Sequence, residues 1–306
     1  MEKGRVLVTG RYGFTGQYVA RALTSAGWQV WGGCSHPTKE MGPFDRVADL
    51  TDAASVNEMI NDIRPDAVVH LAGIAFVGHG SVDDFYNVNL LGTRNLLEAL
   101  AKGGHCKSGV VLASSANVYG NTRISPISES TPPAPANDYA VSKLAMEYVA
   151  KLFANQFPIT ITRPFNYTGV GQDPKFLVPK IVSHFRQRAP RIELGNLDVA
   201  RDFSDVRDVA AVYAALLDRR ISGETINICS GRAIALGEII DMCRAITSHA
   251  IEVTVNPAFV RADEIKILIG NPSRVEAALS GVEVHRFEDT LAWMLLGCET
   301  GRKGRL

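Results

Sequence analysis

The sequence predicts an α/β fold, a doubly wound parallel sheet followed by a smaller α/β domain. Three observations predict it. A strand, a glycine-rich turn and a helix follow one another near the N-terminus. Short apolar strands then alternate with helical patterns up to residue 165, which is typical of a parallel sheet. Beyond it, polar loops separate shorter elements. We therefore expect a first domain over residues 1–165 and a second over 166–306, with an approximate boundary and interleaved elements.

Composition argues against several classes of protein. The 306 residues are 46% hydrophobic and carry no formal net charge, so no nucleic-acid footprint is expected. The five cysteines form no Cys-x-x-Cys pair, and the seven histidines lack zinc-type spacing. No apolar run approaches the ~20 residues of a membrane span. We expect a cytoplasmic protein with reduced thiols, no structural metal, no nucleic-acid partner and no membrane segment.

The first strand, over residues 5–9, runs directly into the glycine-rich segment 10–16, and a helical pattern continues to Gly27. Glycine permits a tight turn and lets backbone amides approach a pyrophosphate at the start of the helix. This order predicts a Rossmann-type dinucleotide-binding domain.

The second strand lacks the acidic residue that would bind a ribose 2′-hydroxyl. Residues 31–36, where that carboxylate is expected, contain none. Arg11 in the glycine-rich turn, with Ser35 or His36, is able to receive a 2′-phosphate instead. The sequence therefore favours NADP(H) over NAD(H) as the cofactor.

The alternation of strands and helices continues to residue 165. We expect a helix that Thr51 or Asp52 caps and that reaches Ile63. The further expected elements are strand 67–71, helix 83–101, strand 109–113, loop 126–135, helix 138–156 and strand 159–162. Ligands of a parallel sheet bind beyond the carboxyl ends of its strands, and Gly10, Ala72, Ser115 and Arg163 follow four of them.

Tyr139 and Lys143 are four residues apart on an expected helix, so they project from the same face. A phenol with a pKa near ~10 exchanges protons poorly at neutral pH. A neighbouring ammonium favours the phenolate, so we expect Lys143 to lower the pKa of Tyr139 and make it a usable acid or base.

The chain beyond residue 165 predicts a smaller α/β unit. The expected elements are loop 166–173, amphipathic helix 176–188, strand 192–194, charged loop 197–208, helix 209–217, strand 226–228, a helix from 236, strands from 251 and near 267, and two last helices.

Several motifs in one order resemble the extended short-chain dehydrogenase/reductase family, also called the NAD-dependent epimerase/dehydratase family. The matching segments are residues 9–16, 71–73, Asn89 with 92–93, Ser115 with Tyr119, and Tyr139 with Lys143. The resemblance implies that Ser115 hydrogen-bonds the reacting oxygen, Tyr139 moves the proton and Lys143 holds the nicotinamide ribose. The cofactor-binding residues that it implies are Gly10, Arg11, Gly13, Phe14, Asp49, Leu50, Leu71, Ala72, Gly73, Asn89, Tyr139 and Lys143.

The second domain resembles the GDP-sugar group of this family. The resemblance implies that Lys180, Arg201 and Arg261 meet the diphosphate and that Glu264 meets the ribose. Arginine forks suit phosphate oxygens, and a carboxylate suits vicinal hydroxyls. The full set of implied substrate-binding residues is Asn166, Lys180, Asn196, Arg201, Arg261 and Glu264.

Ala116 and Asn117 separate two activities of the GDP-sugar group. GDP-mannose 4,6-dehydratases place a carboxylate just after the catalytic serine or threonine, whereas neither residue here is an acid or base at neutral pH. A 4-keto reductase needs hydride and the tyrosine proton alone. The resemblance therefore implies reduction of GDP-4-dehydro-6-deoxy-D-mannose to GDP-D-rhamnose or GDP-6-deoxy-D-talose. The alternatives are a dehydratase, a nucleotide-sugar 4-epimerase and a dinucleotide-sensing protein without turnover.

Helices 83–101 and 138–156 carry many apolar side chains. In the resembling family these two helices pair across a dimer as a four-helix bundle, so we expect a homodimer through them.

Overall fold

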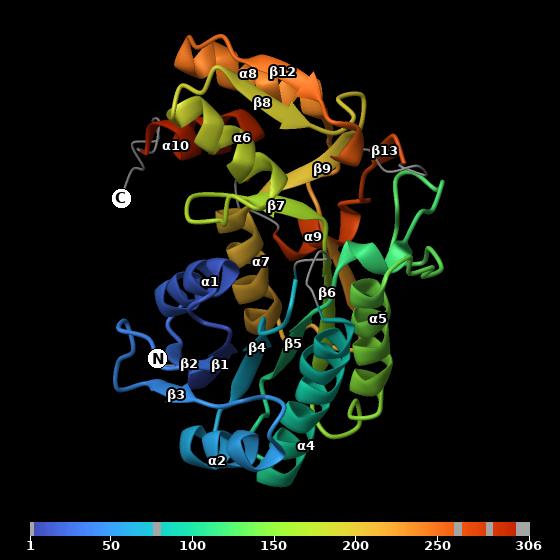
Figure 1. Cartoon of the computed structure of the whole chain (residues 1–306). Helices are drawn as coiled ribbons and strands as arrows, with labels where there is room; N and C mark the ends of the chain where they lie inside the picture. Colours follow the sequence, from blue (N-terminus) through green and yellow to red (C-terminus); the bar gives the residue numbers. More distant parts are fainter. Residues whose placement is uncertain (1–2, 76–80, 260–264, 280–283, 298–306) are drawn as a thin grey trace.

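The computed structural model describes residues 3–75, 81–259, 265–279 and 284–297. A seven-stranded parallel sheet lies at the centre of the molecule (Figure 1). All its neighbouring strands pair in parallel, in the order β10-β6-β5-β4-β1-β2-β3. The strands are β1 (Arg5–Thr9), β2 (Gln29–Cys34), β3 (Asp45–Val47), β4 (Ala67–His70), β5 (Gly109–Ala113), β6 (Ile159–Pro164) and β10 (Thr225–Ile228). This sheet confirms the predicted fold class.

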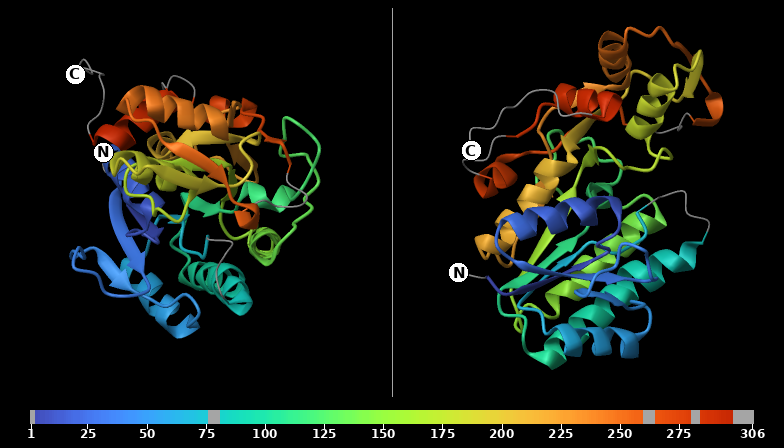
Figure 2. Two further views of the ribbon diagram at one scale, coloured as in Figure 1. Left: turned by 45° about the horizontal axis from the view of Figure 1, so that its top comes forward. Right: turned by 90° about the vertical axis from the view of Figure 1, so that its left-hand side faces the viewer.

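Helices cover both faces of the sheet (Figure 2). One face packs against α1 (Phe14–Ser25) and α7 (Val206–Asp218), and the other against α2 (Ala53–Ile63), α4 (Thr93–Gly103) and α5 (Asp138–Lys151). In β1, Val6 and Val8 join the first core and Leu7 the second. Because a strand buried on both faces is apolar throughout, β1 appears in the sequence as a continuous apolar run.

Two predicted helices differ from their expected bounds. Segment 83–101 contains α3 (Val82–Asp84), the π-helical η1 (Phe85–Gly92) and then α4. Where η1 meets α4, the Thr93 hydroxyl donates to the Asn89 carbonyl at 2.7 Å, and such side-chain bonds to the backbone accompany departures from α-helical geometry. Helix α5 ends at Lys151, where turns replace the helix expected to reach residue 156.

The remaining elements form a smaller α/β part above the carboxyl edge of the main sheet (Figure 1). Strand β9 (Ala200–Asp205) pairs with β7 (Asn166–Thr168), β11 (Ala233–Ala235) and β13 (Ile267–Leu268), and β8 (Arg191–Leu194) pairs with β12 (Glu252–Val255). Its core lies between these strands and α6 (Leu177–Arg186), α8 (Leu236–Thr247) and α10 (Phe287–Leu296). Short helices η2 (Ala116–Tyr119), η3 (Pro257–Phe259) and α9 (Ser273–Ala278) complete the order.

The prediction of a charged loop over residues 197–208 was wrong. Strand β9 occupies residues 200–205 and α7 begins at Val206. The two aspartates of β9 are buried and hydrogen-bonded. Asp202 accepts from the backbone N–H of Ser230 at 2.7 Å, and Asp205 caps α7 by accepting from the Arg207 N–H at 2.7 Å. Charge alone therefore did not indicate a solvated segment here.

Helix α7 and strand β10 follow residue 165 in the chain but pack with the first sheet. Within the described residues, no helix combines the length and the apolar character that a membrane span requires.

Candidate active site

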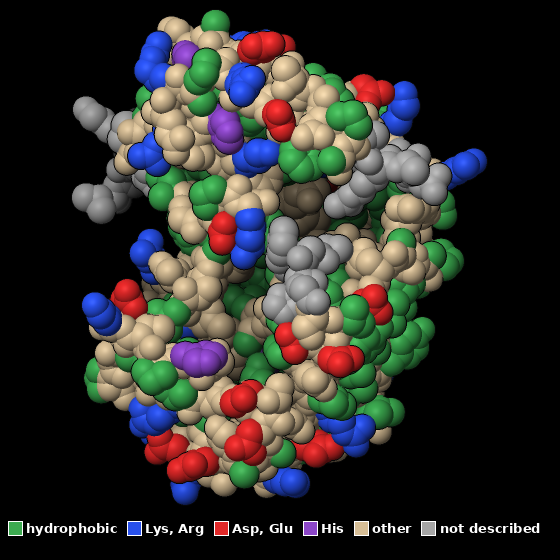
Figure 3. All heavy atoms as spheres, in the orientation of Figure 1, with side chains coloured by type: hydrophobic (Ala, Val, Ile, Leu, Met, Phe, Trp, Pro, Cys, Tyr) green, Lys and Arg blue, Asp and Glu red, His purple; other side chains and the backbone are tan. Residues whose placement is uncertain are grey.

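The carboxyl ends of β1, β4 and β5 bring the predicted residues to one edge of the sheet. Gly10 follows β1, and its backbone lies against Ala72 beyond β4. Ser115 lies two residues beyond β5, and α5 places Tyr139 and Lys143 beside it. On the face of the molecule shown in Figure 3, the surface is hollowed between the sheet domain and the smaller part.

Ser115, Tyr139 and Lys143 are all buried and lie together. The Ser115 hydroxyl hydrogen-bonds the phenol of Tyr139 and accepts from both the backbone N–H and the side-chain amide of Asn117, each at 3.1 Å. The ammonium of Lys143 donates to the carbonyl of Ala113 at 2.7 Å. The two bonds from Asn117 leave the Ser115 proton to be directed towards Tyr139 or a ligand oxygen.

The expected lowering of the Tyr139 pKa by Lys143 was wrong for this geometry. Burial raises the pKa of Tyr139 to about 12, and only the hydrogen bond from Ser115 opposes it. Burial also lowers the pKa of Lys143 to about 8, against the attraction of Glu147. Desolvation outweighs the pairing because both groups lie in the protein interior.

The glycine-rich turn leaves room for a pyrophosphate at the start of α1. Gly10 adopts a φ of +69°, and a Cβ on Gly16 would lie 2.1 Å from the Gly10 carbonyl oxygen. Helix α1 begins after Gly13 with neither a capping side chain nor an acidic residue in its first turn. Its first amides can therefore meet an anion, so these residues fit a dinucleotide.

Phe14, the first residue of α1, stacks on Tyr167 with ring centroids 6.1 Å apart. The Tyr167 hydroxyl hydrogen-bonds that of Thr15 at 2.8 Å. Sequence analysis missed Tyr167, and its position directly after Asn166 in β7 was the available signal.

Arg11 pairs with a carboxylate that the sequence did not predict. Its Nη1 donates to Asp45 Oδ1 at 2.5 Å, and the other Asp45 oxygen accepts from the Tyr12 hydroxyl and the Gly42 N–H, each at 2.7 Å. The Asp45 side chain is 1% exposed, whereas that of Arg11 is 30% exposed. The Arg11 side chain therefore lies beside Gly32 of β2, where it is partly exposed and paired with the buried Asp45.

The other predicted cofactor residues lie in two loops. Asp49 and Leu50 follow β3, where Thr51 donates to Asp49 and lowers its pKa. Residues 71–73 follow β4, and the Asn89 side chain accepts from the Ile74 N–H at 2.8 Å and so holds this loop. A Cβ on Gly73 would lie 2.8 Å from Asn89 Oδ1 and 3.4 Å from Lys143 Nζ, so only glycine fits this position comfortably.

His70 is a buried residue that sequence analysis did not consider. Its Nδ1 bonds the Thr9 hydroxyl at 2.7 Å and its Nε2 that of Thr93 at 2.9 Å, while Thr9 Oγ1 also accepts from the Ala72 N–H. Burial, with the nearby charge of Lys143, lowers the pKa of His70 to about 3. A neutral imidazole thus connects the glycine-rich turn to the loop after β4 and to Asn89.

The predicted substrate residues that the structure describes lie in the smaller part. Asn166 donates to the Asp202 carbonyl at 3.3 Å. Lys180 donates to the Glu193 carbonyl at 2.9 Å, and its ammonium lies over the Phe259 ring. Arg201 Nη1 donates to the carbonyls of residues 200, 265 and 266. Asn196 lies between β8 and β9, and Arg261 and Glu264 lie outside the described residues.

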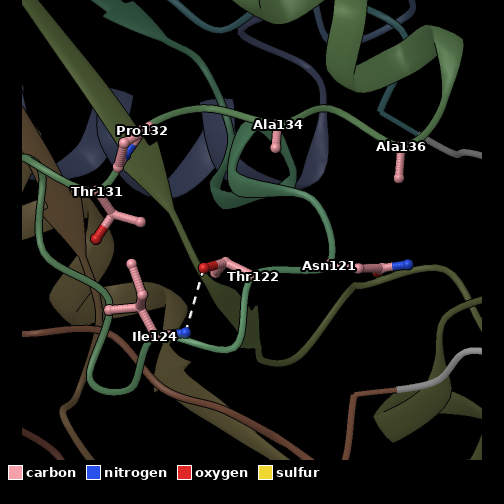
Figure 4. Close-up of a pocket in the computed structure, with 7 residues that line it drawn as sticks. All are labelled: Asn121, Thr122, Ile124, Thr131, Pro132, Ala134 and Ala136. Atoms are coloured by element: carbon pink, nitrogen blue, oxygen red, sulfur yellow. Dashed lines mark hydrogen bonds between the residues drawn. The ribbon is translucent and has the colours of Figure 1, made fainter.

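A pocket lies between two arms of the loop that joins η2 to α5 (Figure 4). Its lining residues are Asn121, Thr122, Ile124, Thr131, Pro132, Ala134 and Ala136. None of these side chains titrates, so the pocket has no acid–base chemistry of its own. Among the described residues, no group of three His, Cys, Asp or Glu side chains is placed to hold a metal ion.

The family comparison covers most of the chain. The model of the NAD dependent epimerase/dehydratase family matches residues 6–229. GDP-6-deoxy-D-talose 4-dehydrogenase from Aggregatibacter actinomycetemcomitans is 38% identical, with 89% of this chain and 90% of the relative covered. GDP-6-deoxy-D-mannose reductase from Pseudomonas aeruginosa is 34% identical, with 89% of each covered.

Solved structures agree over nearly the whole length. RMD from Pseudomonas aeruginosa, complexed with NADPH, has a TM-score of 0.82 at 30% identity, covering 96% of this chain and 98% of its own. A Burkholderia cenocepacia J2315 protein has a TM-score of 0.91 at 48% identity, with 97% and 98% covered.

Proposed function

The chain belongs to the NAD dependent epimerase/dehydratase family, and we propose that it reduces GDP-4-dehydro-6-deoxy-D-mannose at C4 with a reduced nicotinamide dinucleotide. The family prediction from the motifs is thereby confirmed. The names of the two relatives, GDP-6-deoxy-D-talose 4-dehydrogenase and GDP-6-deoxy-D-mannose reductase, support the proposed substrate. Each name refers to a 6-deoxyhexose linked to GDP.

Three side chains of this chain perform the proposed proton chemistry. A bound reduced nicotinamide would supply hydride to C4 of the sugar. Tyr139 gives its phenolic proton to O4 as the C4–O4 double bond becomes a single bond, and Ser115 donates a hydrogen bond to the same oxygen. Lys143 attracts the electrons that remain on the phenolate. Because the pKa of Tyr139 is raised to about 12, the phenol carries its proton at neutral pH, as a proton donor must.

The observation that carries this proposal is the pair of hydrogen bonds that Asn117 makes. Asn117 lies two residues after Ser115, and both its backbone N–H and its side-chain amide donate to the Ser115 hydroxyl. An amide cannot act as a general acid or base at neutral pH, and this one already donates its hydrogen bond to Ser115. Elimination of water from GDP-mannose needs an acid or base at this position, so the geometry favours the keto reductase over the dehydratase.

We propose NADPH as the preferred cofactor, with NADH as the alternative. The supporting feature is Arg11, whose side chain lies beside Gly32 of β2, remains 30% exposed and is held by the buried Asp45. The NADPH bound to RMD is consistent with this preference in a relative of similar fold.

We further propose the partition of the chain and of its binding residues. Residues 1–165 bind the dinucleotide, and residues 166–306 bind the nucleotide sugar through Asn166, Lys180, Asn196, Arg201, Arg261 and Glu264. Lys180 supports this role best, since it is a half-buried residue whose ammonium reaches the Glu193 carbonyl of β8 and lies over the exposed Phe259 ring.

A homodimer through η1, α4 and α5 is also proposed. Leu96, Leu97 and Phe153 are buried in the core, whereas Leu91 and Leu152 are 48% and 69% exposed. Apolar side chains gather along the edge of the molecule formed by α5 (Figure 3). A second copy would cover this apolar surface.

The test is a reductase assay with GDP-4-dehydro-6-deoxy-D-mannose and either NADPH or NADH. We expect one reduced cofactor to be consumed per sugar, and Tyr139→Phe to abolish this consumption while still binding cofactor. NMR of the product then distinguishes GDP-D-rhamnose from GDP-6-deoxy-D-talose, the configuration that the 38% identical relative favours. Failure of both cofactors would refute the reductase, and a keto product from GDP-mannose with oxidised cofactor would establish the dehydratase.

A further inference from the structure

One face of α5 lies against three consecutive residues at the end of β5. Tyr139, Lys143 and Glu147 are spaced by four, so they project from this face on successive turns. All three side chains are buried. The proposed chemistry uses the first two and leaves the third, a buried carboxylate, without a role.

Each of the three side chains bonds one residue of the strand end. The contacts are Ser115 to Tyr139, Lys143 Nζ to the Ala113 carbonyl at 2.7 Å, and the Ser114 hydroxyl to Glu147 Oε1 at 2.5 Å. We call these three contacts the α5–β5 ladder. Because Ser114 directly precedes Ser115, a shift of one residue moves the other.

Glu147 is fixed in its turn by β6. Arg163 Nε donates to Oε1 at 2.9 Å and Nη2 to Oε2 at 2.6 Å, a two-pronged pair that is nearly closed to solvent. The guanidinium also lies 4.8 Å from the centroid of the Tyr119 ring. A planar fork of this kind allows one orientation of the carboxylate, so Glu147 joins α5, β5 and β6 rigidly.

We propose that Glu147 is a positioning residue of the reductase site, which holds Ser115 in register with Tyr139 through Ser114 and supplies the negative charge opposite Lys143. This inference rests on the proposed function for its effect on turnover, but its structural part is measurable without turnover.

The charge on Lys143 depends on few groups. Tyr139 on the same helix is neutral below its pKa of about 12, and His70 on β4 is neutral above its pKa of about 3. Among the described residues, Glu147 is the group whose charge raises the pKa of Lys143 against the effect of burial. The remaining charged group near Lys143 in the described part of the chain is Arg163, which pairs with Glu147.

Glu147→Gln is the direct test, since it keeps the shape and removes the charge. The pKa of Lys143 is followed by NMR of the lysine side chains, with Lys143→Arg to assign the signal. We expect the pKa to fall by about one unit. We also expect kcat to fall by about tenfold and its decline at alkaline pH to begin about one unit lower, with the dissociation constant of NADPH within about twofold.

The matched control is Asp205→Asn, which removes another buried carboxylate that an arginine fork binds, here from Arg207 at 3.0 and 2.7 Å. It should lower stability and leave the Lys143 titration in place. If it moves that titration as far as Glu147→Gln does, or if Glu147→Gln changes neither the titration nor kcat, the proposal is wrong.

Two variants serve if Glu147→Gln does not fold. Ser114→Ala removes one contact of the α5–β5 ladder and keeps the ion pair, so kcat should fall while the Lys143 titration stays. Glu147→Gln combined with Arg163→Gln avoids leaving the Arg163 guanidinium buried without its partner, and the Lys143 pKa should still fall. An unchanged kcat in the first, or an unchanged titration in the second, contradicts the proposal. Absence of turnover in the wild type would refute the proposed function alone.

Discussion

Acid should destabilise this protein through His70 before most carboxylates titrate. The imidazole is buried between Thr9 and Thr93, and each ring nitrogen already has a partner. Burial lowers its pKa from 6.5 to about 3, so the folded state binds a proton less readily than the unfolded chain. Stability is therefore full above pH 6.5 and declines as the pH falls from 6.5 towards 3.

The size of the effect follows from the two pKa values. One pKa unit corresponds to about 1.4 kcal/mol, so lowering the pH from 7.5 to 5.0 crosses about one and a half units of the shift and costs about 2 kcal/mol. His285 acts in the opposite direction, because its bond to Asp208 raises its pKa. Only the difference between wild type and a His70 variant isolates the effect.

The assay is urea unfolding at pH 7.5 and 5.0 for wild type, His70→Gln and His105→Gln. The exposed His105 serves as the control. We expect wild type and His105→Gln to lose about 2 kcal/mol more than His70→Gln over this range. Equal losses in all three proteins, within about 0.5 kcal/mol, would show that His70 is already protonated or solvated in the folded state.

Three further predictions concern the cofactor, the pH profile and the assembly. Arg11→Ala should weaken NADPH binding by about tenfold or more and NADH binding by less than about twofold, as measured by fluorescence titration, and equal losses would remove Arg11 from the 2′-phosphate site. Reductase turnover should decline as the pH rises through about 8, because Lys143 loses its proton there, and a flat rate to pH 10 would contradict this. Leu152→Asp, on a side chain that is 69% exposed, should convert the dimer to a folded monomer in sedimentation, whereas a monomeric wild type would refute the dimer.

The sequence predicted the main sheet well because its strands are local and apolar. Strand β5 appears within its predicted bounds, and Asp52 caps α2 as one of the two expected residues. Long-range pairing decided what the sequence missed. Asp45 reaches Arg11 across 34 residues and His70 reaches Thr9 across 61, so no local pattern joins them.

Glu147 shows that a missed residue can still have a local signal. Its spacing of four from Lys143 and of eight from Tyr139 placed it on the catalytic face of an expected helix. The spacing did not predict the partners of Glu147, which are Ser114 after β5 and Arg163 on β6. The prediction of a charged loop over residues 197–208 was wrong for the same reason. Asp202 and Asp205 accept hydrogen bonds from residues on distant loops and helices.

The pKa values of Tyr139 and Lys143 have opposite consequences for the two directions of the proposed reaction. Reduction needs a protonated phenol and a charged ammonium, and any pH below about 8 supplies both. Oxidation of the alcohol needs the phenolate, which in this geometry forms only near pH 12, where Lys143 is neutral. The reverse reaction therefore requires that ligand binding lower the pKa of Tyr139, whereas reduction requires no such change. At neutral pH, desolvation thus leaves this pair in the protonated state from which reduction starts.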